Sequence, residues 1–450
     1  LTSLDAVGEK GARRRNFRQD RLLLETLYGG GPGASPQAYR IETDGAPRTR
    51  FRLGRVSDSR AITGGDVVLR QDLPGLDLPR AACPFADDWQ GGDRRSPTSG
   101  APDVLIHDPR NDDNLMVGQI TVVFKLLHNA VFELLEKAAG TGADPDELFV
   151  RARRVVTYAY RRVVVKDLLA RLMHRPVYSR YETRSETPNF IDREDDDRLP
   201  LEFTHAAFRM GHAMVQDSYL LNGLRGWRDG LQALLDMTSE DQYFDMPMPY
   251  DWLVDWSMFF TDSTADPKVN LSRRIGPKLA RAFRLVGPEG EQPLLEKDLI
   301  RSMNSGLRSV ESLIDELPRA ITGDYPLLSD RRFRETAIAD WLSSGETKLA
   351  EEDIRCLAED PPLFFFVLFE AMELEDGKSL GPLGSTILGE VIFRAREDGR
   401  AFVEDHPDLD ADLQCVFGAS APYTMSGLIT VMRDRFELRV GYDADMAQGG

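Results

Sequence analysis

The chain has 450 residues, of which 42% are hydrophobic, and its 74 acidic and 56 basic residues give a formal net charge of −18. This length and apolar content are enough for a large core and for one to three domains. A surface this acidic repels phosphate backbones, which argues against general nucleic-acid binding.

Three widely spaced cysteines, Cys83, Cys356 and Cys415, form neither a disulfide framework nor a zinc pattern. The chain begins at Leu1 without a methionine or an apolar leader, which indicates a processed product, a trimmed chain or a fragment. The longest apolar run, Pro362 to Phe369, is far shorter than the roughly 20 residues that a membrane-spanning helix needs. We therefore expect a soluble protein, cytoplasmic or secreted without a visible signal peptide, with no membrane span. Its oligomeric state is left open.

Residues 1–105 are rich in Gly, Pro and Arg and have weak periodicity, which predicts a loop-rich N-terminal part of the domain. Short strands are predicted at Phe51 to Arg55 and at Ala61 to Leu69, and an exposed loop at Asp87 to Ala101. The glycine-rich stretch from Tyr28 to Gly33 predicts a turn, because it lacks the strand-loop-helix context of a phosphate-binding loop.

Helical periodicity dominates residues 106–400. Apolar residues recur every three or four positions from Leu115 to Leu135, which predicts a mostly buried helix. Asp144-Pro145 combines an N-cap with a proline at the first helical position and predicts a second helix that runs through Leu169. Thr204 is expected to cap a third helix through Phe208, His212 and Val215. Further helices are predicted at Trp252 to Phe260, Pro293 to Ser302, Arg332 to Leu342, Glu352 to Ala358, Leu363 to Met372 and Ser385 to Arg396.

These elements predict a mainly α fold with little β structure, organised as a single large helical domain. Residues 106–400 are expected to form its core, and residues 401–450 a C-terminal segment that packs on that core.

The six histidines include one with distinctive neighbours. His205 and His212 lie seven residues apart, but neither has a partner at i+4 and no HExxH occurs, so a helical zinc site has little support. Beside His212, Gly211 removes a side chain, which leaves space next to the helix, and Arg209 lies on an adjacent helical face.

Three motifs follow one another along the chain: Asp108-Pro109-Arg110-Asn111-Asp112-Asp113-Asn114, Phe208-Arg209-Met210-Gly211-His212 and Asp298-Leu299-Ile300-Arg301. With them, the chain resembles the bacterial branch of the animal-type haem peroxidase superfamily over roughly residues 17–396. The resemblance implies haem b, with His212 as the axial iron ligand and with Arg209 and Arg301 as propionate partners. It also implies that Arg110 is the distal arginine, which would stabilise the leaving oxygen as peroxide splits.

The sequence departs from the family pattern at two acidic positions. Asp113 stands where the family often has a glutamate that is ester-linked to haem, and its shorter side chain argues against a covalent link. Asp298 stands where the family has an asparagine bonded to the axial histidine. A carboxylate there should give His212 more imidazolate character, and bound haem a lower ferric/ferrous potential, than asparagine would.

Two other parts of the family pattern are missing. No histidine precedes His107, so the family's distal histidine, its general base, is absent from this chain, and nothing in the sequence marks His107 as a substitute. Truncation and evolutionary loss both explain this absence, and the start without methionine favours truncation. In the stretch that matches the family's calcium loop only Glu25 offers a hard oxygen ligand, which argues against calcium.

The resemblance implies an enzyme that uses hydrogen peroxide to oxidise small organic donors or halides. A second reading is a catalytically impaired peroxidase-fold protein that binds haem or a partner without turnover. A third is an acidic helical interaction protein without haem. Fatty-acid dioxygenases of the superfamily carry a radical-forming tyrosine three residues before the axial histidine, and Arg209 at that position argues against their activity.

Overall fold

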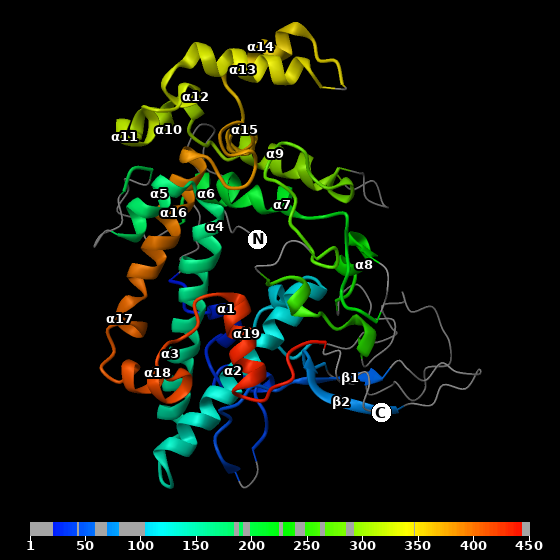
Figure 1. Ribbon diagram of the computed structural model, residues 1–450, viewed down its shortest axis with the longest axis vertical. Coiled ribbons are helices and arrows are strands. Elements are labelled where there is room, and N and C mark those ends of the chain that lie inside the picture. Colours follow the sequence, from blue (N-terminus) through cyan, green and yellow to red (C-terminus); the bar gives the residue numbers. More distant parts are fainter. Residues whose placement is uncertain are drawn as a thin grey trace, which may run out of the picture. The chain divides into compact units, whose positions relative to one another are not determined.

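The computed structural model describes residues 21–42, 45–58, 70–80, 104–183, 189–191, 199–224, 228–238, 248–261, 266–284, 292–345 and 347–442. These residues fall into two compact units. The first is built mainly from Val164–Asp217 and Ser272–Gly399, and the second from Leu23–Val163, Ser218–Leu271 and Arg400–Gly450. Figure 1 colours the chain along its sequence, so that each unit can be followed by its labels.

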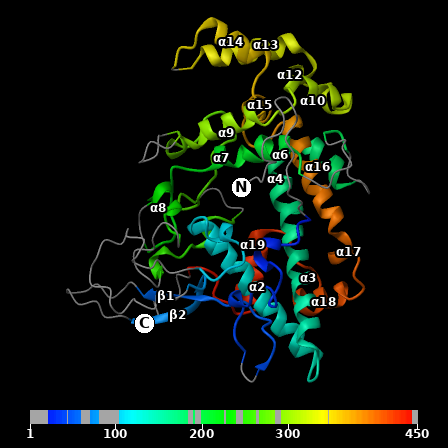
Figure 2. The ribbon, with the colours of Figure 1, turned by 180° about the vertical axis from the view of Figure 1, so that it is seen from behind.

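Two long helices organise the second unit, α2 (Leu115–Ala139) and α3 (Pro145–Val163), which pack against each other. The side chain of Asn114 caps α2 by accepting from the Val117 amide at 3.1 Å. Asp144 accepts from the Asp146 amide at 3.0 Å, and α3 begins at the adjacent Pro145, as the sequence predicts. Helix α18 (Leu409–Phe417) contacts both long helices and lies beside α3 in Figures 1 and 2.

Helix α2 is the one helix of the described residues that is long and apolar enough to cross a bilayer. That is weak evidence for a span, because 78% of its apolar window is buried inside the structure, as in a core helix.

A small sheet lies in the same unit. Strand β1 (Gly54–Asp58) pairs antiparallel with β2 (Arg70–Asp77) and parallel with β5 (Met248–Pro249), and Val56 faces both Leu73 and Met248 across the ladders. A second ladder joins β3 (Ser218–Tyr219) to β4 (Asp229–Gly230). The other elements of the unit are α1 (Glu25–Tyr28), η1 (Pro36–Ala38), η5 (Pro109–Asp112), α8 (Leu231–Leu235), η8 (Tyr250–Trp252), η9 (Trp256–Met258), α17 (Arg400–Val403) and α19 (Met425–Asp434).

The first unit begins where α3 passes into a π-helical segment, η6 (Val164–Leu169), followed by α4 (Ala170–Leu172). Its core is formed by α15 (Leu363–Glu375) and α16 (Pro382–Asp398), whose apolar side chains are buried almost throughout. The other elements of the unit are α5 (Arg175–Glu182), α6 (Leu201–His205), η7 (Ala207–Met210), α7 (Gly211–Met214), η10 (Arg281–Phe283), α9 (Leu294–Asn304), α10 (Val310–Glu316), α11 (Arg319–Thr322), α12 (Pro326–Ser329), α13 (Arg331–Ser343) and α14 (Glu351–Glu359).

The described residues confirm the mainly α prediction, but two predicted helices are wrong. Thr204 does not cap a helix through His212: it lies inside α6, and the backbone leaves helical geometry at Ala206, so three short pieces replace one helix. Between Trp252 and Phe260 only short 3-10 turns form. There the Asp255 side chain accepts from the Ser257 amide at 3.0 Å, and such a local bond competes with the helical ladder.

The predicted strand at Phe51 to Arg55 overlaps β1, which begins three residues later. The strand predicted at Ala61 to Leu69 and the loop at Asp87 to Ala101 lie outside the described residues. The predicted domain bounds, 1–105, 106–400 and 401–450, stay a prediction.

Candidate functional site

A histidine and a carboxylate from two helices meet in the first unit. His212 lies in α7 and Asp298 in α9, and Nδ1 of His212 lies 2.6 Å from Oδ2 of Asp298. The Asp298 side chain has no exposed surface, whereas His212 is 29% exposed. An ionised carboxylate only accepts hydrogen bonds, so Nδ1 carries the proton and Nε2 of the neutral ring keeps its lone pair.

Arg209 completes this cluster from the preceding turn, η7. Its guanidinium lies 3.1 Å from Oδ1 of Asp298, and its Nε donates to the Thr204 carbonyl at 3.1 Å. A buried carboxylate is costly unless it is paired, and Arg209 supplies the opposite charge. The structure therefore places Arg209 against Asp298, and its predicted propionate contact stays a prediction.

The surroundings of His212 leave room for a planar group. A Cβ added at Gly211 would meet no atom within 4 Å, so the space beside this glycine is open. The Phe283 ring lies 5.9 Å from the His212 ring, between centroids. A histidine with a protonated Nδ1 held by a carboxylate and an available Nε2 is the arrangement found at metal-ligating histidines. These residues fit a haem iron ligand.

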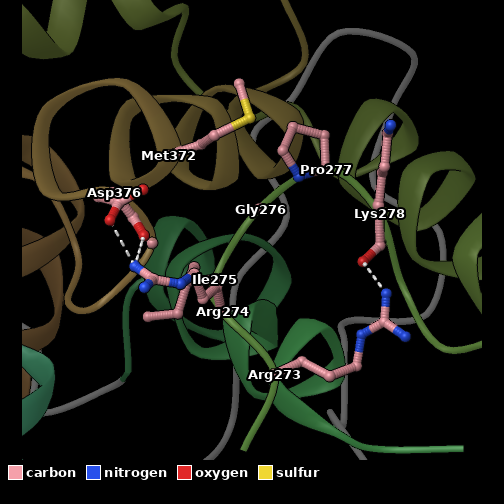
Figure 3. Close-up of a pocket in the computed structure, with 9 residues that line it drawn as sticks. Arg273, Arg274, Ile275, Gly276, Pro277, Lys278, Met372 and Asp376 are labelled. Atoms are coloured by element: carbon pink, nitrogen blue, oxygen red, sulfur yellow. Dashed lines mark hydrogen bonds and ion pairs between the residues drawn. The ribbon is translucent and has the colours of Figure 1, made fainter.

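The segment after residue 272 ties the end of α7 to the end of α15. The Arg273 amide donates to the Met214 carbonyl and the Ile275 amide to the Gly377 carbonyl, both at 2.8 Å. The segment lines a pocket of about 390 Å³ (Figure 3). Within the pocket the Arg274 guanidinium is paired with the Asp376 carboxylate at 2.6 Å, so the positive charge of Arg274 is already balanced.

Arg301 lies three residues beyond Asp298 on α9 and is exposed. Its carbonyl accepts from the Ser305 hydroxyl at 2.5 Å. The structure does not bring its guanidinium into the cluster of His212, Asp298 and Arg209 by any described contact, and its predicted propionate role stays a prediction.

Arg110 and Asp113 belong to the second unit, at the short helix η5 that precedes α2. The Asp108 carboxylate caps this helix by accepting from the Arg110 amide at 3.0 Å and from its Nε at 2.7 Å, and it also accepts from a terminal guanidinium nitrogen. The Arg110 side chain is 36% exposed, and Asp113 is exposed. The geometry shows a capped helix start with a paired arginine.

Sequence reasoning missed a buried charged group next to this segment. Asp112 forms a two-pronged ion pair with Arg80, at 2.9 and 2.8 Å, and Arg80 also contacts Asp77 at 3.2 Å. Lys125 is 1% exposed, and its amino group has no hydrogen-bond partner among the described residues. Burial lowers the Lys125 pKa to about 7, partly opposed by the Asp77 charge. No motif marks Lys125, because its sequence context is an ordinary apolar helix.

His107, three residues before Arg110, is also marked by the structure. Both of its ring nitrogens are buried and lack hydrogen-bond partners within the described ranges. Burial, followed by the nearby Lys125 charge, lowers its pKa to about 4, so the ring is neutral at pH 7. A neutral imidazole can accept a proton, although a general base works best with a pKa near the operating pH.

Metal ligands other than a haem-type histidine do not cluster in the described part of the chain: no three His, Cys, Asp or Glu side chains gather in a way that could hold an ion. Glu25, the candidate calcium ligand, is exposed and accepts from the Leu23 amide at 3.2 Å.

Comparison with known proteins bears on the fold and the family. The family described as animal haem peroxidase matches residues 59–246, a range that contains Arg110, Asp113, Arg209 and His212 and ends before Asp298. Peroxidase A from Dictyostelium discoideum has a similar structure, with a TM-score of 0.54 and 16% sequence identity over 94% of this chain and 70% of that chain. No curated protein matches the chain.

The fold is therefore similar to that of a peroxidase, and the short helix α7 carries the candidate iron ligand. Together the two matches confirm that the chain resembles the animal-type haem peroxidase superfamily.

Proposed function

We propose that this protein is a haem-dependent peroxidase that uses hydrogen peroxide to oxidise small organic donors or halides. The observation that carries the proposal is the 2.6 Å contact between Nδ1 of His212 and Asp298, in a chain that matches the animal haem peroxidase family. Bound haem b would supply an iron that peroxide can oxidise and that donors can reduce again.

His212 would hold the iron through Nε2. Asp298 fixes the ring orientation and draws on the Nδ1 proton, which raises the basicity of Nε2 as a ligand. Arg209 holds Asp298 in place from the other side at 3.1 Å. The open space beside Gly211 would admit the flat ring. The side chains of His212, Asp298 and Arg209 come from three separate elements, α7, α9 and η7, so the contacts between these side chains position the ligand.

Arg110 would stabilise the anionic oxygen that leaves as peroxide splits, because a guanidinium stays charged at any working pH. This role requires Arg110 to exchange its Asp108 contacts, at least in part, for the reacting oxygen. Asp113 is exposed, and its short side chain favours haem without a covalent link.

The alternative is a peroxidase-fold protein that binds haem or a partner without turnover. The contacts of Arg110 favour this reading, since Asp108 holds both the backbone amide and the guanidinium of that residue.

A hemin titration of the full chain, followed at the Soret band, tests the proposal. One-to-one binding with an axial-histidine spectrum is expected in the native chain and is expected to be lost in His212→Ala. His406→Ala is a matched control, because the His406 side chain is 32% exposed, close to the 29% of His212, and lies outside this cluster. Binding that survives in His212→Ala would overturn the assignment of the ligand. Specific binding without peroxide turnover would favour the alternative.

A further inference from the structure

A chain of three hydrogen-bonded side chains lies elsewhere in the first unit. The Tyr325 hydroxyl lies 2.8 Å from Nε2 of His174, and Nδ1 of the same ring lies 2.6 Å from Oε1 of Glu375. Tyr325 precedes α12, His174 precedes α5, and Glu375 is the last residue of α15. The Ser379 hydroxyl donates to the other Glu375 oxygen at 3.1 Å.

The partners fix the direction of each hydrogen bond. The Glu375 carboxylate only accepts, so Nδ1 of His174 carries a proton and Nε2 of the neutral ring accepts from the Tyr325 phenol. His174 is held rigidly: it is 6% exposed, and its backbone amide donates to the Ser385 hydroxyl at 2.7 Å. A base within hydrogen-bond reach, itself oriented by a third group, is the arrangement that activates a proton-bearing side chain for reaction.

We propose that Tyr325 is a redox-active tyrosine that exchanges electrons with one-electron organic donors. A strong one-electron oxidant takes an electron from the phenol, and the phenolic O–H bond breaks as its proton moves to Nε2 of His174. The products are a neutral Tyr325 radical, an imidazolium beside the Glu375 carboxylate, and the oxidant reduced by one electron. A donor then returns the electron, and the proton moves back to the phenol oxygen. For its natural oxidant the inference rests on the proposed peroxidase function.

The local charges favour this proton movement. Burial, and then the charges of Glu375, Asp324 and Glu370, raise the pKa of Tyr325, so the phenol keeps its proton until an electron leaves. The Glu375 carboxylate, 2.6 Å from Nδ1 of His174, would stabilise the imidazolium that forms there. Tyr325 is half-buried, so a donor in solution can approach it.

A second tyrosine–histidine pair, in the second unit, lacks this support. The Tyr28 hydroxyl lies 3.0 Å from Nδ1 of His128, whose Nε2 faces the Thr49 carbonyl at 3.0 Å, and neither side chain is exposed. Burial lowers the pKa of His128 to about 4, with the charges of Arg153 and Arg50 acting in the same direction and the hydrogen bond to the Thr49 carbonyl opposing it. Among the described residues no carboxylate is hydrogen-bonded to His128, so an imidazolium there would lack a counter-charge, and Tyr28 should resist oxidation although its hydrogen bond is similar.

Photogenerated tris(bipyridine)ruthenium(III), an outer-sphere one-electron oxidant, tests the inference on the full haem-free chain. Radicals are trapped with a nitroso spin trap, and peptide mass spectrometry locates the adduct among the 12 tyrosines. We expect the adduct at Tyr325, none at Tyr28, and loss of the main signal in Tyr325→Phe. Glu375→Gln keeps a hydrogen-bond acceptor but removes the charge, and should slow Tyr325 oxidation at least about tenfold. In the control Glu373→Gln, which removes an exposed carboxylate of the same helix, Tyr325 should be oxidised at the native rate.

Adducts that spread over other tyrosines and spare Tyr325, or oxidation of Glu375→Gln at the native rate, would overturn the inference. The adduct map of the native chain needs no variant, so it decides the matter even where a variant does not fold. The ruthenium oxidant needs no haem. A negative result here therefore refutes the role of Tyr325, whereas a negative hemin titration refutes the proposed function.

Discussion

Removal of the Asp298 carboxylate is the most direct perturbation of the candidate site. Asp298→Ala leaves the His212 ring proton without its acceptor and the Arg209 guanidinium without its ion-pair partner, and the Arg209 side chain is only 16% exposed. Breaking a buried ion pair by removal of one partner costs about 3–5 kcal/mol. Because water reaches part of both partners, we expect the free energy of unfolding of the haem-free chain to fall by about 2–3 kcal/mol.

The same change should weaken haem binding by a separate route. Loss of the group that orients a metal-ligating histidine typically lowers metal affinity by about 10–100-fold, which is about 1.4–2.7 kcal/mol. Urea unfolding of the haem-free chain and hemin titration of the folded chain measure the two effects independently.

Glu296→Ala is the matched control, since it removes an exposed carboxylate from the same helix, α9, and should change neither quantity by more than about 0.5 kcal/mol. A folded Asp298→Ala variant that binds hemin with native affinity would refute the role given to Asp298. An equal loss of affinity in the control would show that α9 as a whole, and not this carboxylate, is responsible.

Three further predictions concern charged residues. In the hemin-loaded chain Arg110→Ala should slow the reaction with peroxide by about 10²-fold or more in stopped-flow spectroscopy, and a rate within about threefold of native would contradict its role. Burial raises the Glu370 pKa from 4.5 to about 7. The contribution of Glu370 to the free energy of unfolding is therefore complete below pH 4.5, and it falls by about 3 kcal/mol as the pH rises to 7. The difference in free energy of unfolding between the native chain and Glu370→Gln, measured with urea, should change with this slope from pH 5 to 7.5. A difference that does not depend on pH would exclude the raised pKa of Glu370. Lys125→Met should raise the free energy of unfolding at pH 7 by roughly 1–3 kcal/mol, because the buried amino group has no hydrogen-bond partner among the described residues, whereas destabilisation would show that Asp77 and Asp112 more than offset its burial.

The long helices could be predicted from the sequence because their signals are local. The apolar period of α2 and the Asp144-Pro145 start of α3 each lie within a few residues of the element that they define. The break before η9 could not be predicted, because distant contacts help to set it. Asn222 donates to the carbonyls of Asp251 and Leu253, at 2.8 and 2.7 Å, and so engages backbone acceptors that a helix would use.

The candidate site was predictable only in part, because some of its contacts join residues that are far apart in the sequence. The partnership of His212 with Asp298 followed from a family motif, and the two atoms do meet. Family roles gave Arg209 a different partner, since the carboxylate at position 298 is this chain's departure from the pattern. The contacts of His174 span 151 and 201 residues of sequence, to Tyr325 and to Glu375, and no motif joins them.

The departure at Asp298 and the position of Arg209 are best understood together. A carboxylate with no exposed surface needs a counter-charge, and Arg209 provides one at 3.1 Å while His212 donates to the other oxygen at 2.6 Å. The arginine therefore balances part of the pull that the carboxylate exerts on the His212 ring proton. Arg209→Gln should release that pull and lower the ferric/ferrous potential of bound haem, whereas Asp298→Asn should raise it.

The double variant tests whether the two residues act as one unit. The potential of the double variant should return toward the native value, because the Asp298 charge and the Arg209 charge that balances it are both gone. A coupling of about 0.5–3 kcal/mol between two changes is typical of residues in contact. Spectroelectrochemical titration of the four hemin-loaded proteins measures this directly. If both single variants shift the potential in the same direction, Arg209 does not balance Asp298, and the carboxylate at position 298 must be stabilised in another way.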